Sequence, residues 1–207
     1  RPRAKRIGLV NGFPVLGHTY DDQDGEQPSR LWWPQLVQLV RPEIWDPDLT
    51  TQANYTVSVP QAGDGSIMHI KAGVVGVVIC ERAIYRMRYV NLPQIFEFDR
   101  IATGRGCVAP GAAIDVGNTT FFIDQDGLYS TDGNDVSPIG HGKVDRTIAA
   151  RLNKAALNTI VSAIMPDRSV ALWLLPLDSA DRPSHALAYA WKEGRFSLGE
   201  VGGSWRT

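Results

Sequence analysis

Residues 112–139 read AAIDVGNTTFFIDQDGLYSTDGNDVSPI, and this stretch decides the expected fold class. Four short apolar runs, at 112–116, 119–123, 128–130 and 136–139, are separated by turns rich in Gly, Asn and Asp. Runs of this length are typical of strands, and these turn residues favour tight reversals of the chain. The stretch therefore predicts four short strands that form one antiparallel meander.

Similar series of apolar runs lie on both sides of this meander. The runs lie at 67–72, 74–80 and 83–89 before it, and at 160–164, 170–175, 186–191 and 195–198 after it. The series begin near residues 67, 112 and 160, and a spacing of about 40–50 residues is typical of propeller blades. The pattern predicts repeated four-stranded antiparallel blades.

The first 60 residues are expected to supply a partial fourth blade. Asn11-Gly12 joins the runs Ile7–Val10 and Phe13–Leu16, and Asn-Gly favours the tight turn of a two-residue hairpin. Residues 34–63 contain four prolines and predict long connections with little regular structure.

A helical insert is expected at about 145–158, between two meanders. Ile148, Leu152 and Ala156 recur at helical spacing, with Asp145 as the expected N-cap and Asn153 as the point where two short helices separate. The expected fold is therefore mainly β, with one β-propeller-like domain over residues 1–207. A β-sandwich is the main competitor, because it also uses short strands and frequent turns.

Composition is that of an ordinary globular protein. The 207 residues are 43% hydrophobic and 21% charged, with a net charge of −1. The sequence contains no apolar run as long as a membrane helix and no overall positive charge to hold nucleic acid. Two cysteines, Cys80 and Cys107, do not make a disulfide scaffold in a chain of this length.

Motifs for catalysis or cofactor binding are not found. The four histidines are scattered, with none at metal-ligand spacing from another or from a cysteine. The turns Asp22–Gly25 and Asp124–Gly127 each match the middle of a calcium-binding loop, but both lack its first ligand and its closing Glu. We therefore predict no catalytic residues, no cofactor and no metal, and a protein that is not an enzyme.

Arginine dominates the basic residues, at 16 of 21. In the run 83–89, Arg86 and Arg88 lie on one face while Tyr85 and Met87 lie on the other. Arginine is enriched at protein interfaces, so Arg86 and Arg88 are the candidate subunit interface, with the acidic loop Asp21–Glu26 or Asp132–Asp135 as partner. The alternative is that both arginines pair within their own subunit.

Several ordered segments resemble a known protein family. They are Val78–Tyr89, Phe96–Arg100, Gly104–Gly111, Val116–Tyr129, Asp132–Gly140 and Lys143–Arg146. Together they resemble the packaged-DNA stabilisation or tail-hub (nozzle) proteins of short-tailed bacteriophages. The resemblance covers residues 60–175 well, and 5–50 and 186–200 more loosely.

The resemblance implies a structural protein of the virion tail that is assembled in the host cytoplasm. Such subunits form a ring, with a hexamer favoured, that extends the DNA channel below the portal and adaptor and retains the packaged genome. Double-stranded DNA would pass through without specific binding, and a balanced charge suits such a channel. Family members are usually much longer than 207 residues, which favours a fragment or a reduced subunit here.

A carbohydrate-binding or glycan-cleaving β-propeller is the competing hypothesis. Six tryptophans are present, including the pair Trp32-Trp33, whose side chains must point to opposite faces of a strand. Trp173 and Trp191 lie in apolar runs and are expected in the core. Exposed clustered tryptophans with convergent carboxylates would favour this second class.

Overall fold

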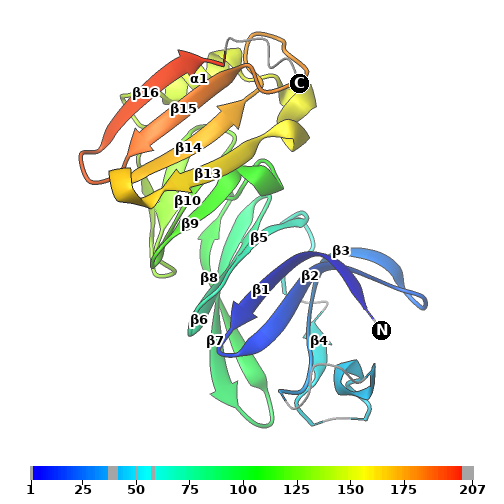
Figure 1. Cartoon of the computed structure of the whole chain (residues 1–207). Coiled ribbons are helices and arrows are strands. Elements are labelled where there is room, and N and C mark those ends of the chain that lie inside the picture. Colours follow the sequence, from blue (N-terminus) through cyan, green and yellow to red (C-terminus); the bar gives the residue numbers. More distant parts are fainter. Residues whose placement is uncertain (1, 37–41, 50, 57–58, 202–207) are drawn as a thin grey trace. The chain divides into compact units, whose positions relative to one another are not determined.

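The computed structural model describes residues 2–36, 42–49, 51–56 and 59–201. It is mainly β, with four sheets of four antiparallel strands each, as the sequence predicts (Figure 1). Within each sheet the strands follow the order of the chain, so each sheet is a meander. This arrangement is propeller-like and has twice the number of sheets that a β-sandwich contains.

The first sheet contains four strands where a partial blade was expected. Its strands are β1 (Arg3–Val10), β2 (Phe13–Asp21), β3 (Gly25–Trp33) and β4 (Asn54–Thr56). Asn11 and Gly12 both have positive φ, at 48° and 83°, as the predicted hairpin turn requires. The short fourth strand and the 3₁₀ helix η1 (Pro42–Trp45) are the described regular elements in the irregular region.

The second sheet contains one strand that the sequence analysis did not predict. Its strands are β5 (Ile67–Lys71), β6 (Val75–Cys80), β7 (Ala83–Asn91) and β8 (Ile95–Thr103). The unpredicted strand is β8, in which Phe96 and Phe98 alternate with Glu97 and Asp99. Glu97 and Asp99 interrupt the apolar residues of β8, so this strand has no continuous apolar run of the kind that predicted the other strands.

The stretch that decided the fold class forms the third sheet, as predicted. Its strands are β9 (Ala113–Val116), β10 (Thr119–Ile123), β11 (Leu128–Thr131) and β12 (Val136–Pro138), in the order β12-β11-β10-β9. The 3₁₀ helix η2 (Pro110–Ala112) precedes it. The fourth sheet comprises β13 (Val161–Met165), β14 (Val170–Leu175), β15 (His185–Ala190) and β16 (Arg195–Glu200), with the 3₁₀ helix η4 (Pro166–Arg168) between its first two strands.

The helical insert is present, with one correction at its start. It consists of α1 (Asp145–Arg151) and the 3₁₀ helix η3 (Lys154–Thr159), and Asn153 separates them as expected. The N-cap of α1 is Val144 and not Asp145. The Asp145 carboxylate instead accepts a hydrogen bond from Leu128 N at 3.0 Å, which ties the helix to β11.

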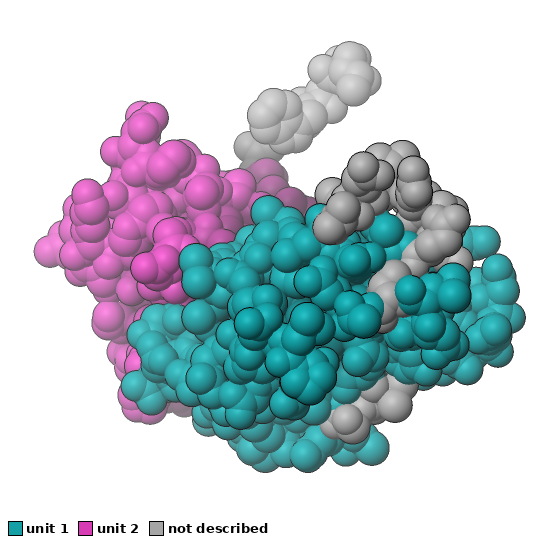
Figure 2. All heavy atoms as spheres, turned by 90° about the horizontal axis from the view of Figure 1, so that it is seen from below, with its two compact units in different colours: residues 1–107, 132–136 teal, residues 108–131, 137–207 magenta. Residues whose placement is uncertain are grey.

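The chain divides into two compact units (Figure 2). Unit 1 comprises residues 1–107 and 132–136, and unit 2 comprises residues 108–131 and 137–207. The prediction of a single domain over residues 1–207 stays a prediction. Unit 1 therefore holds the first two sheets, and unit 2 holds the fourth sheet and most of the third.

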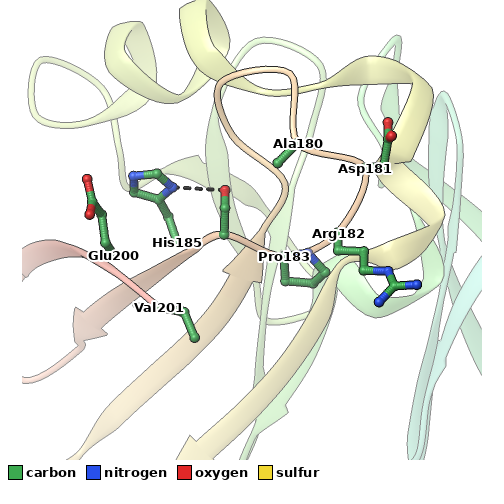
Figure 3. A pocket seen from close by; sticks show the side chains of 8 residues that line it. Ala180, Asp181, Arg182, Pro183, His185, Glu200 and Val201 are labelled. Carbon is green, nitrogen blue, oxygen red and sulfur yellow. Dashed lines mark hydrogen bonds between the residues drawn. The ribbon is translucent and has the colours of Figure 1, made fainter. Parts of the chain in front are cut away.

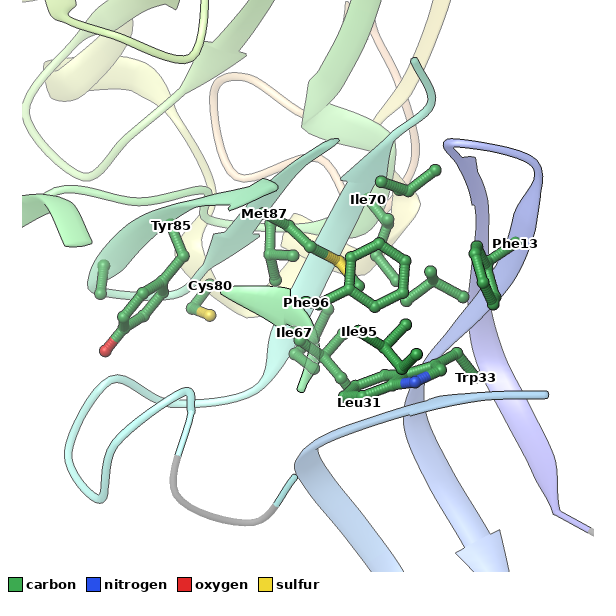
Figure 4. Close-up of a cluster of buried hydrophobic side chains, with 14 residues drawn as sticks. Phe13, Leu31, Trp33, Ile67, Ile70, Cys80, Tyr85, Met87, Ile95 and Phe96 are labelled. Carbon is green, nitrogen blue, oxygen red and sulfur yellow. The ribbon is translucent and has the colours of Figure 1, made fainter. Parts of the chain in front are cut away.

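The core of unit 1 lies between the first and second sheets (Figure 4). Phe13, Leu31 and Trp33 come from the first sheet, and Met87 and Phe96 come from the second. The Phe96 ring meets the rings of Phe13 and Trp33 edge-on, each at 5.2 Å between centroids, which is a favourable aromatic geometry.

In unit 2 the fourth sheet packs on the third. Trp173 is fully buried and donates its indole N–H to Ala112 O at 3.0 Å. Phe121 of the third sheet meets Tyr189 of the fourth edge-on at 5.3 Å. Trp173 is thus a core residue, as predicted, while Trp191 is half-buried and lies 6.3 Å from the Phe121 ring.

Candidate functional site

Arg86 and Arg88, the predicted interface residues, lie on the outer face of β7 and are both partly exposed. Arg86 donates to Asp99 Oδ2 from Nε at 3.2 Å and from Nη2 at 3.0 Å, and from Nη1 to Asn134 Oδ1 at 2.8 Å. Arg88 donates to Asp99 Oδ2 at 2.9 Å and to Glu97 Oε2 at 2.9 Å. Direct pairing of Arg86 with Asp99 and of Arg88 with Glu97 across β7 and β8 explains these contacts.

The two arginines and two carboxylates form a charge-neutral cluster. Hydrogen bonds from Arg88 and then Arg86 hold the pKa of Asp99 below its usual range, so the cluster keeps its ion pairs at neutral pH. Arg86 and Arg88 therefore pair with carboxylates of their own subunit, as the alternative interpretation expected. A role for this face in a subunit interface stays a prediction.

The acidic loop 132–135, one of the two proposed partners, already contacts Arg86 through Asn134 within unit 1. Asp132 Oδ1 accepts hydrogen bonds from the backbone N–H of Asn134 at 2.8 Å and of Asp135 at 3.2 Å. These bonds lower the pKa of Asp132 and show that its carboxylate shapes the turn.

The second proposed partner, the loop 21–26, is also tied down internally. Glu26 accepts hydrogen bonds from Lys5 Nζ at 2.6 Å and pairs with His18 Nε2 at 2.6 Å. The hydrogen bond from Lys5 and then that with His18 lower the pKa of Glu26 to about 2. Contacts within the first sheet therefore neutralise much of the negative charge of this loop.

A buried arginine that the sequence analysis did not single out occupies the other end of this loop. Arg30 is 1% exposed and donates Nε to Thr19 Oγ1 at 2.8 Å and Nη1 to Asp24 Oδ2 at 2.7 Å. Its Nη2 pairs with Asp21. The guanidinium also lies over the Trp32 ring, 4.9 Å from its centroid, which adds a cation–π contact.

A pocket of about 530 Å³ in unit 1 lies beside this arginine. It is lined by aromatic and acidic side chains, among them Trp32, Trp45, Tyr55, Asp21, Asp22 and Asp48. Trp32 donates Nε1 to Trp45 O at 2.9 Å and packs against Tyr55, with ring centroids 4.8 Å apart. Trp33 is buried on the opposite face, as predicted for the tryptophan pair.

A second pocket, of about 630 Å³, lies in unit 2 between the loop 180–185 and the end of β16 (Figure 3). Ser184 Oγ lies 3.0 Å from His185 Nδ1, and Asp178 Oδ2 lies 3.9 Å from His185 Nε2. This is a Ser–His–Asp combination of the kind that hydrolases use, so its geometry needs testing against that chemistry.

The hydrogen bonds around His185 are wrong for a nucleophilic serine. Arg151 Nη2 lies 3.0 Å from His185 Nε2, and because a guanidinium can only donate, Nε2 must accept. The ring proton is then on Nδ1 and is donated to Ser184 Oγ, so His185 cannot remove the serine proton. Ser184 also bonds Leu177 N and O at 3.1 and 3.2 Å, which gives it a role in holding the loop.

The incomplete calcium loops serve as turns. Asp124 N donates to Gly127 O at 2.8 Å, and Asp124 Oδ1 accepts from Gln125 N at 2.7 Å. Among the residues described, no three His, Cys, Asp or Glu side chains are grouped as a metal would need, and no helix is long and apolar enough to span a membrane. The absence of a metal, cofactor or catalytic residue stays a prediction.

Comparison with known proteins adds no family assignment. No family model matches the chain, and no curated protein is significantly similar to it. The resemblance to phage tail-hub proteins therefore stays a prediction. Sequence reasoning missed the Arg30 cluster and the aromatic pocket, because both depend on residues brought together by strand pairing across β2, β3 and β4.

Proposed function

We propose that this chain is a structural protein of a bacteriophage tail, a subunit of the ring that extends the DNA channel below the portal and adaptor. The observation that carries the proposal is the agreement between the family's ordered segments and the repeating sheets. The segments from Val78 to Arg146 include parts of β6–β8, most of β10, β11 and β12, and the start of α1. Four of the six segments therefore lie on strands of the second and third sheets, while Gly104–Gly111 and Lys143–Arg146 lie on connections between sheets.

The electrostatics support a passive channel component. The chain has a net charge of −1, and Arg86 and Arg88 are neutralised by Asp99 and Glu97. A wall that attracted phosphates strongly would hinder passage of DNA, because each phosphate contact adds affinity. The proposed partners are identical subunits, the adaptor and neighbouring tail proteins, with double-stranded DNA passing through without specific binding.

Electron microscopy of particles carrying a tagged copy of the protein tests this proposal. We expect the tag in a ring on the tail axis, directly below the portal and adaptor, with six copies favoured. A particle that lacks the protein, or that carries it away from the tail axis, would overturn the proposal.

Carbohydrate binding is the second candidate, and the aromatic pocket of unit 1 is the observation that favours it. Trp32 and Tyr55 offer rings, while Asp22 and Asp48 offer hydrogen-bond acceptors for hydroxyl groups. Glycan cleavage is less well supported, because a general acid needs a raised pKa. Burial acts to raise the pKa of Asp21, but hydrogen bonds from Asp24 N, Gln23 N and Arg30 lower it by more. The net effect is a lowered pKa.

A glycan array probed with the purified protein separates the two candidates. Saturable binding that is lost in Trp32→Ala would favour the carbohydrate class. We expect no such binding from a channel subunit.

A further inference from the structure

Three strands of the fourth sheet, β13, β14 and β15, expose an apolar face on the side away from the third sheet, while the matching positions of β16 are Arg195, Ser197 and Gly199. Strand pairing assigns three outward positions to each of β13, β14 and β15. They are Val161, Ala163, Met165, Val170, Leu172, Leu174, Ala186, Ala188 and Ala190. All nine are apolar and none is buried, with Val161 54% and Met165 39% exposed.

This pattern is unusual for a sheet face in contact with water. Antiparallel sheets with one solvated face normally alternate apolar and polar residues. The same chain follows that rule on the outer face of β7 and β8, where Arg86, Arg88, Glu97 and Asp99 lie. The contrast indicates that the outer face of the fourth sheet is covered in the working protein.

Unit 1 carries a protruding apolar patch that complements this face. Ile7, Leu9 and Val74 are 69%, 55% and 77% exposed, and they are three of the four most exposed large apolar side chains described. Gly73 N donates to Leu9 O at 2.9 Å, and Asn11 N donates to Gly73 O at 2.8 Å, which brings Val74 next to β1. We call Ile7, Leu9 and Val74 the β1 patch.

We propose that the β1 patch of one copy docks on the outer face of the fourth sheet of a second copy. The six alanine and valine positions of that face leave room for the larger Ile7 and Leu9 side chains. The contact continues a mode of packing that the chain already uses, because apolar faces of its sheets stack on one another within each unit. A second copy is therefore an occupant of the right chemistry.

The contact uses two different surfaces, so it is head-to-tail and leaves one free surface at each end of a pair. Repetition of such a contact closes a ring or extends a filament. The inference rests on the proposed function, because a ring requires two complementary patches on each subunit. It names those patches as the β1 patch and the fourth sheet, rather than Arg86 and Arg88.

The size of the face sets the expected affinity. Three strands spaced about 4.8 Å apart and about 20 Å long present roughly 300 Å² per partner. A total of roughly 600 Å² is smaller than standard stable interfaces. We therefore expect single contacts to be weak, with self-association of the purified protein appearing at about 100 µM, or roughly −5.5 kcal/mol.

Sedimentation velocity of the full chain between about 10 and 500 µM tests the proposal. We expect the wild type to associate, and Ile7→Glu and Leu172→Glu each to stay monomeric. Val90→Glu is the matched control, because Val90 is a 38% exposed apolar residue of β7 outside both surfaces. Circular dichroism checks that each variant folds, and Ala188→Glu replaces Leu172→Glu if the latter does not.

Mixing the two variants gives the decisive result. Ile7→Glu keeps an intact fourth-sheet face, and Leu172→Glu keeps an intact β1 patch, so an equimolar mixture should form a 1:1 dimer and nothing larger. A wild type that is monomeric at the highest concentration, or a mixture without dimer, overturns the proposal. Continued association of Ile7→Glu alone also overturns it, because the face would then pair with itself.

Failure of the mixing test can be distinguished from failure of the proposed function. The presence of the protein in the tail of the particle is read by microscopy, whichever surfaces hold the subunits together. A protein found in the tail whose variants fail the mixing test refutes the docking surfaces alone.

Discussion

Replacing Arg30 by Met should destabilise unit 1 strongly, although it removes no part of the apolar core. Arg30 is 1% exposed and bridges Asp21, Asp24 and Thr19 on the first sheet. Met has a similar length and fills the space beneath Trp32 but carries no charge. The change therefore leaves the carboxylates that face Arg30 without their counter-ion.

The magnitude follows from the exposure of the two carboxylates. The Asp21 side chain is 13% exposed and the Asp24 side chain is 54% exposed. Removing one partner of a buried ion pair costs about 3–5 kcal/mol, while an exposed pair contributes about 0–1 kcal/mol. Asp21 still accepts N–H bonds from Gln23 and Asp24, so we expect a loss of about 3 kcal/mol in the free energy of unfolding.

Arg88→Met is the matched control, because Arg88 is 41% exposed and its partner Glu97 is 47% exposed. The control should lose no more than about 1 kcal/mol.

Hydrogen exchange of β2 and β3 peptides in increasing urea measures the stability of unit 1 directly. For an m-value of about 1.5 kcal/mol/M, the midpoint for Arg30→Met should fall by about 2 M relative to wild type. The double variant Arg30→Met with Asp21→Asn should recover part of that loss, because it removes the uncompensated charge. A midpoint for Arg30→Met within about 0.5 M of the midpoint for Arg88→Met, roughly one-quarter of the expected shift, would refute the reasoning.

Three further predictions follow from named contacts. If the face that carries Arg86 and Arg88 is an interface, as the sequence analysis predicts, Arg86→Ala with Arg88→Ala should weaken self-association more than it lowers the melting temperature; unchanged self-association of the double variant contradicts that role. Trp173→Phe should cost at least about 1 kcal/mol in the free energy of unfolding, because it loses one buried hydrogen bond and leaves a cavity; a smaller cost would contradict the buried bond to Ala112 O. Lys5→Met should raise the pKa of Glu26 from about 2, measured by NMR titration of its carboxyl carbon.

The pH dependence linked to Glu26 has a definite sign. Its folded pKa lies below its usual value of 4.5. A carboxyl with a depressed folded pKa stabilises the protein above its unfolded pKa, and that stability is lost as pH falls through the folded value. The contribution of Glu26 should therefore disappear between about pH 4.5 and pH 2, and Lys5→Met should reduce that change.

Local sequence chemistry was sufficient to predict most of the strands. Asn11-Gly12 supplies two positive φ angles, and the Gly117 turn and the Asp132-Gly133 turn mark the ends of strands in the third sheet. These features act over a few residues, so they can be read without knowledge of the fold. The same holds for Asn153, whose side chain accepts from Ala155 N and so starts a new helical turn.

The predictions that failed involved residues distant in sequence. Asp145 had the position expected of an N-cap, but its carboxylate instead accepts a hydrogen bond from Leu128 N, 17 residues earlier in the chain. Strand β4, at Asn54–Thr56, is too short to recognise and exists because it pairs with β3. Burial of Arg30 requires β3 to meet β2 and the turn that joins them, where Thr19, Asp21 and Asp24 supply its partners, and no local sequence pattern predicts this.

The sequence by itself determined the class of fold, because the apolar runs and the turn-forming residues between them are local features of the chain. It also contained the apolar runs 170–175 and 186–190, in which residues of both faces are apolar. Only the tertiary structure decided which of those residues are core and which are exposed. Packing against the third sheet buries Trp173 and Leu187 and leaves Leu172 and Ala188 outward, and a single run of apolar residues cannot encode that choice.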